Sequence, residues 1–308
     1  MIGWDRLRVF AAVAERGSIA AAAEQLHITG PAVSQHLRKL EREVRCQLVE
    51  PDGRGVRLTA AGRVLAGSAR SMADTASVAE RDLATIDEVV AGPLRIGAVA
   101  SAVRALLPDV LRALAASHPR LEPWLRDGEV KELLPALRAG QLDAVIMESW
   151  DVRPAPLPSG VRATRLLTED VVLAVDDRHP LAGQPAVSVN QLHRQSWTSC
   201  PADTEAHVAV VQMLRQHGVH VDIRYQVADY STQLSLVAAG LAVAMIPRTG
   251  RPATMAGVRF LPCDPPATRT LSLATPAAPA TPPIRALTTE LQRATTQLIR
   301  NTPPPTAG

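Results

Sequence analysis

Aromatic residues are scarce in this chain. Phenylalanine, tryptophan and tyrosine make up 3% of the 308 residues, whereas hydrophobic residues as a whole make up 46%. The cores must therefore be built from alanine, valine and leucine, packed closely without large rings. This length and apolar content are sufficient for two or three folded units.

Cysteines and long hydrophobic runs are also scarce. Cys46, Cys200 and Cys263 are widely spaced and form no C-x-x-C pair, which excludes a disulfide framework and indicates no zinc site. No run of about 18 apolar residues occurs, and no charged and apolar signal sequence precedes Trp4. We therefore expect a cytoplasmic protein with no membrane partner, no metal and no cofactor.

Lysine is nearly absent, because Lys39 and Lys131 are the only two in the chain and arginine supplies the other basic residues. Arginine suits forked contacts to phosphate and guanine, but its abundance can equally reflect genome composition. With a net charge of only +3, charge alone does not identify a nucleic-acid partner.

The first segment predicts two short helices joined by a tight turn. Ser18 can cap the first of them, and Pro31 stands in the first turn of the second, where proline is best tolerated. One face of the second helix is apolar, with Val33, Leu37, Leu40 and Val44. The opposite face carries Pro31, Gln35, Arg38 and Arg42, flanked by Ser34 and Lys39. Such a face fits a recognition helix in the major groove, although ordinary solvated helices also look like this.

A hairpin is expected next. Residues 47–50 and 56–58 predict two strands on either side of a glycine-rich turn at 51–55. This hairpin would form a wing from which Arg54 and Arg57 reach phosphates. A dinucleotide-binding glycine motif is excluded, because Leu58 stands where its third glycine should be.

A single long helix is predicted from Thr59, whose hydroxyl can cap it, to about Val90. Apolar residues recur in heptads, which indicates a coiled coil in a parallel or antiparallel dimer. Burial of this stripe against its own chain is the alternative. The residues that we assign to dimerisation in a homodimer or homotetramer are Leu65, Met72, Leu83 and Ile86.

Strands and helices alternate through the rest of the chain, which predicts an α/β sensor built on parallel sheets. Two Rossmann-like sub-domains are expected, the first at about 93–163 and 268–300 and the second at about 164–267. A cleft at the carboxyl ends of their strands would hold a small molecule. Residues 301–308 read as a flexible tail.

These motifs together resemble one known family. The signature of LysR-type transcriptional regulators is similar to the segment that runs from Gly17 and Ser18 through 27–41 and 53–62. The sensor of the same family resembles four later segments, 94–97, 137–144, 179–181 and 236–241. The resemblance implies a winged helix-turn-helix domain at 2–59, with the helix-turn-helix at about 19–38. It also implies a linker helix at 59–91 and an effector-sensing domain at 93–300 of periplasmic-binding-protein type II.

Site residues are assigned by motif position and by the polar helix face. For DNA they are Thr29, Pro31, Ser34, Gln35, Arg38, Arg42, Arg54 and Arg57, and for the effector Ser101, Glu129, Val130, Thr198 and Ser199. The main-chain amides at helix N-termini near these effector residues could hold an anion. Gly30 replaces a frequent glutamine, and Val99 and Val130 replace frequent hydroxyl residues. The base preference at the DNA site is therefore left open. An effector that is more apolar, or that is held differently, is also compatible with these residues.

The function expected is binding of double-stranded promoter DNA, modulated by a small-molecule effector. An enzyme is the first alternative, but G-x-S-x-G, H-E-x-x-H and phosphate-loop motifs are all missing, so we expect no catalysis. A solute-binding protein is the second alternative. It would leave the first ninety or so residues without a role.

Overall fold

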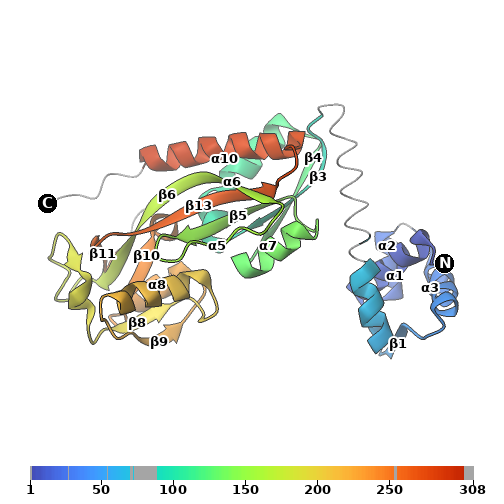
Figure 1. Cartoon of the computed structure of the whole chain (residues 1–308), viewed down its shortest axis with the longest axis horizontal. Helices are drawn as coiled ribbons and strands as arrows, with labels where there is room; N and C mark the ends of the chain where they lie inside the picture. The colour runs from blue at the N-terminus through green and yellow to red at the C-terminus, as the bar shows by residue number, and fades with distance from the viewer. Residues whose placement is uncertain are drawn as a thin grey trace. The chain divides into compact units, whose positions relative to one another are not determined.

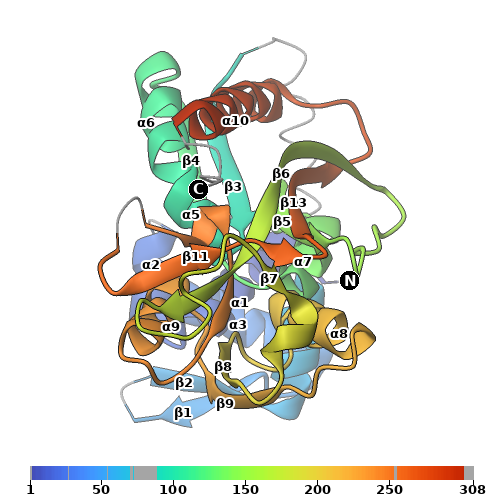
Figure 2. The ribbon, with the colours of Figure 1, turned by 90° about the vertical axis from the view of Figure 1, so that its left-hand side faces the viewer.

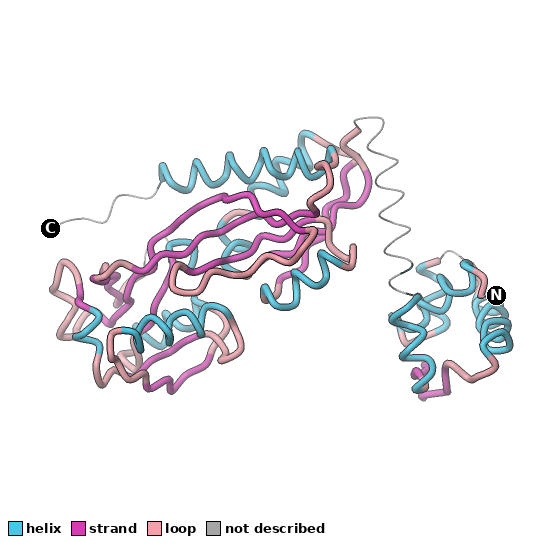
Figure 3. The backbone as a smooth tube through the Cα atoms, in the orientation of Figure 1, coloured by secondary structure: helices cyan, strands magenta, loops and turns pink. Residues whose placement is uncertain are grey.

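The computed structural model describes residues 2–26, 28–53, 55–69, 72, 89–252 and 255–301. The chain divides into two compact units, Met1–Ala84 and Thr85–Gly308. Figures 1 and 3 show the first as mainly helical and the second as a sheet with helices packed against it. Among the described helices, none is long and apolar enough to cross a membrane.

The N-terminal unit consists of three helices and a hairpin. They are α1 (Trp4–Arg16), α2 (Ile19–Gln25), α3 (Gly30–Val44), β1 (Val49–Asp52) and β2 (Gly55–Leu58). Gly17, in the left-handed conformation, ends α1, and the Ser18 side chain accepts a hydrogen bond from the amide of Ala21 at the start of α2. A further helix covers residues 60–69, and Thr59 caps it by accepting from the amide of Gly62.

One apolar core holds this unit together. Phe10, Val13, Val33 and Leu40 have no exposed surface, and they join α1 to α3 with α2 packed beside them. The helical spacing of these residues therefore produces the predicted buried face. The hairpin differs slightly from expectation, because Pro51 and Asp52 extend β1 and pair with Val56 and Gly55.

The C-terminal unit is larger and contains more elements. Its first part holds β3 (Gly92–Ala98), α5 (Ala100–Ala105), α6 (Leu107–Ser117), β4 (Leu121–Asp127), α7 (Val130–Arg138) and β5 (Ala144–Trp150). Then follow β6 (Val161–Asp176), β7 (Val187–Ser188), a 3-10 helix (Val189–Leu192), β8 (Ser196–Ser199), α8 (Glu205–Gln216), β9 (Asp222–Gln226) and α9 (Tyr230–Ala238). The last elements are β10 (Ala244–Pro247), a 3-10 helix (Arg248–Gly250), β11 (Val258–Leu261), β12 (Cys263–Asp264), β13 (Ala267–Pro276) and α10 (Pro282–Asn301).

The main sheet has the strand order β10-β6-β13-β5-β3-β4, with β11 also paired to β6. The expectation of parallel sheets is wrong for most of it: β3 pairs in parallel with β4 and β5, but β13, β10 and β11 all pair antiparallel. Two separate helices, α5 and α6, follow β3. Pro108, in the first turn of α6, has no amide hydrogen to continue a helix from α5.

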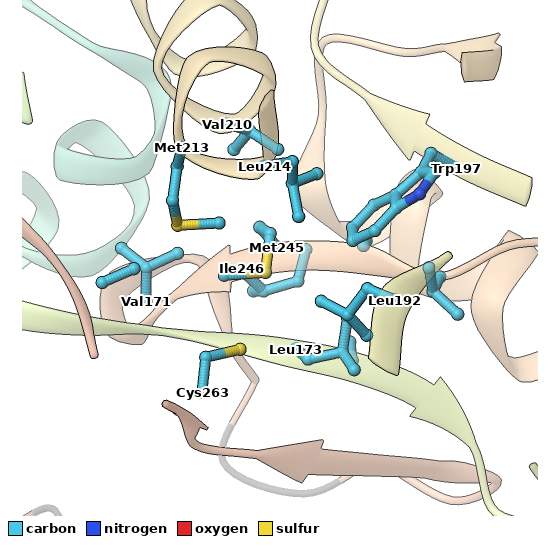
Figure 4. Packing of buried hydrophobic residues seen from close by; sticks show 14 of the residues in the cluster. Val171, Leu173, Leu192, Trp197, Val210, Met213, Leu214, Met245, Ile246 and Cys263 are labelled. Atoms are coloured by element: carbon cyan, nitrogen blue, oxygen red, sulfur yellow. The ribbon is translucent and has the colours of Figure 1, made fainter. Parts of the chain in front are cut away.

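Two hydrophobic cores divide this unit into sub-domains. The first contains β3, β5, α6 and α10, and in Figure 2 α6 and α10 lie together over the sheet. The second surrounds Trp197, Leu214 and Ile246, which Figure 4 shows packed together. The long strands β6 and β13 run through both sub-domains, and each contributes residues to both cores. The main sheet therefore continues from the first sub-domain into the second.

Candidate functional site

The polar face of α3 is open to solvent. Thr29, Pro31, Gln35, Arg38 and Arg42 are exposed and Ser34 is half-buried. Arg38 and Arg42 each donate from Nε to a main-chain oxygen one turn earlier, at 3.3 and 3.2 Å. Among the described residues neither guanidinium forms an ion pair, so each keeps donors free for phosphate or base edges.

Contacts at both ends fix the position of α3. The Thr29 side chain caps its first turn by accepting from the amide of Ala32. Toward the other end, Glu41 Oε1 accepts from the amide of Leu48 at 2.8 Å, and Glu43 pairs with Arg6 of α1 at 2.7 Å. The exposed face is therefore presented by a helix fixed both to its own unit's core and to the hairpin.

The hairpin is anchored on the end of α1. The amide of Val56 donates to the carbonyl of Gly17 at 2.9 Å, and a Cβ at Gly55 would lie only 2.5 Å from that carbonyl oxygen. Only glycine fits this close approach. Arg57 is exposed and pairs with Glu50 on the opposite strand at 3.1 Å, while Arg54 lies outside the described residues.

The residues assigned to dimerisation have different surroundings. Leu65 is partly buried against the core of its own unit, and Ala69, in the same stripe, belongs to that core. Met72 is 47% exposed. Leu83 and Ile86 lie outside the described residues. The start of the stripe is therefore used within the chain, and of the two assigned residues that the structure describes, Met72 is the exposed one.

A cavity of about 80 Å³ lies between the two sub-domains of the C-terminal unit. It is lined by Val99, Ala100, Ser101, Arg104, Glu129, Glu148, Cys200, Ala206, Ala228, Asp229, Tyr230 and Arg269. Two of the assigned effector residues, Ser101 and Glu129, are in this lining. The side chains of Val130, Thr198 and Ser199 are not, because they are buried in strand and helix packing beside it.

Arg269 occupies the centre of this region and has no exposed surface. Its guanidinium pairs with Glu148 at 2.5 Å and with Glu169 at 2.6 Å. The same group donates to the hydroxyls of Ser101 at 3.1 Å and Thr249 at 2.5 Å. Buried charges require such compensation, so this cluster joins β5, β6 and β13 to α5 and to the segment after β10.

Sequence reasoning missed Glu148, Glu169 and Arg269. A signal existed for Glu148, since it directly follows the apolar run 144–147 and extends the same buried strand. Arg269 stands in an alternating stretch that forms β13, whose partners β5 and β6 lie more than 90 residues away in sequence. No local pattern indicates such partners.

Burial raises the pKa of several groups in the cavity lining, among them Glu129 and Cys200. Burial, together with the nearby charge of Glu148, raises the pKa of Glu129 to about 7. Burial also raises the pKa of the Cys200 thiol to about 11. Cys200 is therefore a neutral thiol at physiological pH, and the protonated form of Glu129 is stabilised relative to that of an exposed glutamate.

Ion pairs connect the sub-domains around the cavity. Lys131 of α7 pairs with Asp203, which precedes α8, and Arg153 pairs with Glu205 at 3.1 Å. Arg104 of α5 donates to the carbonyl of Gly250 at 2.7 Å. The first sub-domain is thus linked to the second by polar contacts that are easier to rearrange than a packed core.

Known proteins match both units. A family model described as "Bacterial regulatory helix-turn-helix protein, lysR family" matches residues 4–63, and one described as "LysR substrate binding domain" matches residues 87–296. The DNA-binding transcriptional dual regulator OxyR of Escherichia coli is 28% identical over 265 residues, 85% of each chain. The small neutral protease regulatory protein of Streptomyces coelicolor is 29% identical over 282 residues, 90% of this chain and 88% of that protein.

Two solved structures show the same architecture. A cysteine-to-serine variant of OxyR from Corynebacterium glutamicum, with bound hydrogen peroxide, aligns with a TM-score of 0.63 at 25% identity, covering 97% of this chain and 94% of that one. CbnR in complex with its target DNA aligns with a TM-score of 0.67 at 23% identity, covering 95% and 99%. At 23% identity, the likeness to CbnR shows a shared fold and nothing further.

Proposed function

Because the chain belongs to the LysR family of DNA-binding transcriptional regulators, we propose that α3 and the hairpin bind promoter DNA and that a small molecule in the cavity modulates this binding. The observation that supports the first part is the exposed face of α3, whose arginines are free of ion pairs with described residues. A helix with such a face, held by a second helix and a wing, fits the major groove. Binding of promoter DNA would require that the protein is located in the cytoplasm.

Regulation would use the two sub-domains. A ligand that contacts both Ser101 of α5 and the start of α9 favours one arrangement of the sub-domains over another. It can shift the equilibrium only by its difference in affinity for the two arrangements. The polar links around the cavity, rather than the apolar cores, would rearrange.

Peroxide sensing is a second candidate, because curated relatives include a hydrogen peroxide-inducible genes activator of Escherichia coli. Thiolates, not thiols, react readily with peroxide. Cys200 and Cys263 are buried, and burial raises the pKa of each to about 11. The environment of Cys200 and Cys263 therefore argues against sensing by oxidation of these two residues, whereas Cys46 is exposed. We propose no catalytic activity for this chain.

The experiment that tests DNA binding is a fluorescence anisotropy titration of the full chain. The probe is DNA from upstream of its own gene, with a shuffled duplex as control, across a range of salt concentrations. We expect tighter binding to the upstream DNA, and an affinity that falls steeply with salt because counterions are released from phosphates. Equal affinity for both duplexes at every salt concentration would contradict the proposal.

Self-association is proposed through the helix that begins at residue 60. Met72 is 47% exposed and belongs to the predicted heptad stripe. Met72→Glu should convert a dimer to a monomer in sedimentation velocity, whereas the exposed control Val64→Glu should not. A variant at Met72 that sediments like the parent protein would remove this residue from the interface.

A further inference from the structure

The cavity between the sub-domains is small. Its volume is about 80 Å³, whereas pockets that bind small molecules usually measure about 300–1,000 Å³. Cys200, which belongs to the lining, is only 8% exposed. A ligand that fills a pocket of ordinary size therefore requires the two sub-domains to move apart. The contacts that hold the sub-domains together then control access to the cavity.

One side of the cavity, where α5 faces the segment after β10, is held by a partly buried network. Arg104 donates to the carbonyls of Thr249 and Gly250 at 3.3 and 2.7 Å. Beside it, Arg269, which has no exposed surface, donates to the hydroxyls of Ser101 and Thr249. Opening this side would break several hydrogen bonds at once and leave buried donors without partners, which is costly.

The opposite side of the cavity lies between α7 and α8. The buried residues of α7 belong to the core of the first sub-domain and those of α8 to the core of the second. Arg153 also pairs with Glu205 of α8, but its neighbours Trp150 and Val152 already pack on the second core. Among the described residues, therefore, no shared apolar core joins α7 to α8.

An ion pair between Lys131 and Asp203 joins these two helices. Lys131 is two residues beyond Glu129 and Asp203 is three residues before Ala206, and both Glu129 and Ala206 line the cavity. The paired side chains are 43% and 70% exposed, so the pair lies at the rim of the cavity. Exposed pairs of this kind shift an equilibrium by about twofold to fivefold, and salt screens them. This side can therefore open at little cost.

We propose that the Lys131–Asp203 pair is a latch, which keeps the cavity closed to a ligand of ordinary size while it is formed and admits the effector when it breaks. This inference rests on the proposed role of the cavity as the effector site. The side held by Arg104 and Arg269 stays together and acts as the hinge. Because only the open arrangement takes the ligand, the apparent affinity is reduced by the fraction of the protein that is open.

The three cysteines of the chain report this opening. Cys200 lines the cavity, Cys263 is buried in the same core without lining the cavity, and Cys46 is exposed in the N-terminal unit. The full chain is alkylated with N-ethylmaleimide, and mass spectrometry follows each cysteine separately. Opening of the cavity accelerates the reaction at Cys200 alone, whereas unfolding of the core accelerates it at Cys263 as well.

Lys131→Gln removes the latch. The rate at Cys200 should rise about twofold to fivefold, with the rates at Cys263 and Cys46 unchanged. The matched control is Arg112→Gln, which makes the same change of charge but breaks a pair with Asp109 inside α6, so Cys200 should react as in the parent protein. An unchanged rate at Cys200 in Lys131→Gln, or an equal rise at Cys200 and Cys263, would overturn the latch.

Exchange of the two charges separates the ion pair from other effects of substitution. Lys131→Glu should accelerate the reaction at Cys200 more than Lys131→Gln does, because it places two carboxylates together. Adding Asp203→Lys should bring the rate back toward that of the parent protein. Added salt should accelerate the reaction in the parent protein and have less effect on Lys131→Gln. A double variant that reacts as fast as Lys131→Glu alone would overturn the proposal.

The promoter titration separates this inference from the proposed function. The alkylation experiment contains no DNA and no effector, so it reports the movement of the sub-domains alone. Specific DNA binding together with an unchanged rate at Cys200 in Lys131→Gln would overturn only the latch. Failure of specific DNA binding would overturn the proposed function, whatever the rate at Cys200.

Discussion

Arginines in the two units are used in opposite ways. Arg38 and Arg42 on α3 are exposed, and each donates a hydrogen bond to a main-chain oxygen of its own helix. Arg269 in the C-terminal unit is fully buried and is held by Glu148 and Glu169. The same side chain is therefore available to a partner where it is unpaired, and it serves internal structure where carboxylates surround it. Arginine content alone distinguishes neither role.

The largest effect should come from the buried arginine. Arg269→Ala leaves the carboxylates of Glu148 and Glu169 uncompensated in the interior, which should lower the free energy of unfolding by about 3–5 kcal/mol. Urea denaturation of the variant and of the parent protein measures this difference in the free energy of unfolding. Arg259→Ala, at an exposed position on β11, is the control and should change little. A loss below about 1 kcal/mol at Arg269 would mean that the cluster does not hold the sub-domains together.

A smaller effect is expected on the exposed side of the comparison. Arg38→Ala should weaken binding to the specific promoter duplex by about 1–3 kcal/mol if the side chain reads a guanine edge. Thermal stability should not change, because Arg38 has no ion pair with a described residue. The control is Arg8→Ala, which removes an exposed arginine on α1. Comparing the DNA affinities of the two variants by fluorescence anisotropy separates the loss of a base contact from the loss of one positive charge. Identical affinities of the two variants would remove Arg38 from the interface.

Sequence reasoning succeeded where the determining contacts are local. The cap at Ser18 and the apolar face of α3 depend on residues within a turn or two, and the structure confirms both. The mixed sheet depends on β13 returning between β5 and β6 from far along the chain. The same long-range pairing places Arg269 in the cavity, so neither the sheet nor the buried cluster could be predicted from periodicity.

Glu129 allows a third test, through pH. Its pKa in the folded protein, about 7, lies above the ordinary value of 4.5, so the folded state binds more protons between these values. Stability from this group therefore rises as pH falls through that window and is lost as pH rises through about 7. The charged groups that affect Glu129 are Glu148, Lys131, Asp203 and Glu132.

Glu129→Gln removes this dependence. Urea denaturation at a series of pH values should show the variant gaining stability relative to the parent protein as pH rises from about 4.5 to 7, with little further change above that. A difference between the Glu129 variant and the parent that is flat across the window would contradict the environment described for this carboxyl group.

The smallest effect concerns the hairpin, where an exposed arginine is paired. Glu50 holds Arg57 at 3.1 Å, and surface pairs of this kind contribute about 0–1 kcal/mol. Arg57→Ala should reduce the slope of log affinity against log salt by about one, with little change in sequence preference. Glu50→Gln should instead increase DNA affinity slightly by releasing Arg57. An unchanged salt slope for Arg57→Ala would show that the hairpin does not contact phosphate.

Site-specific cross-linking tests the central claim most directly. A photoreactive residue at Gln35, in the middle of the exposed face of α3, should cross-link to promoter DNA and lose this reaction when unlabelled promoter competes. The same residue at Trp124, which is 66% exposed on β4 of the C-terminal unit, should not react. Promoter DNA that reacts at position 124 and never at position 35 would contradict the assignment of α3 as the DNA-reading element.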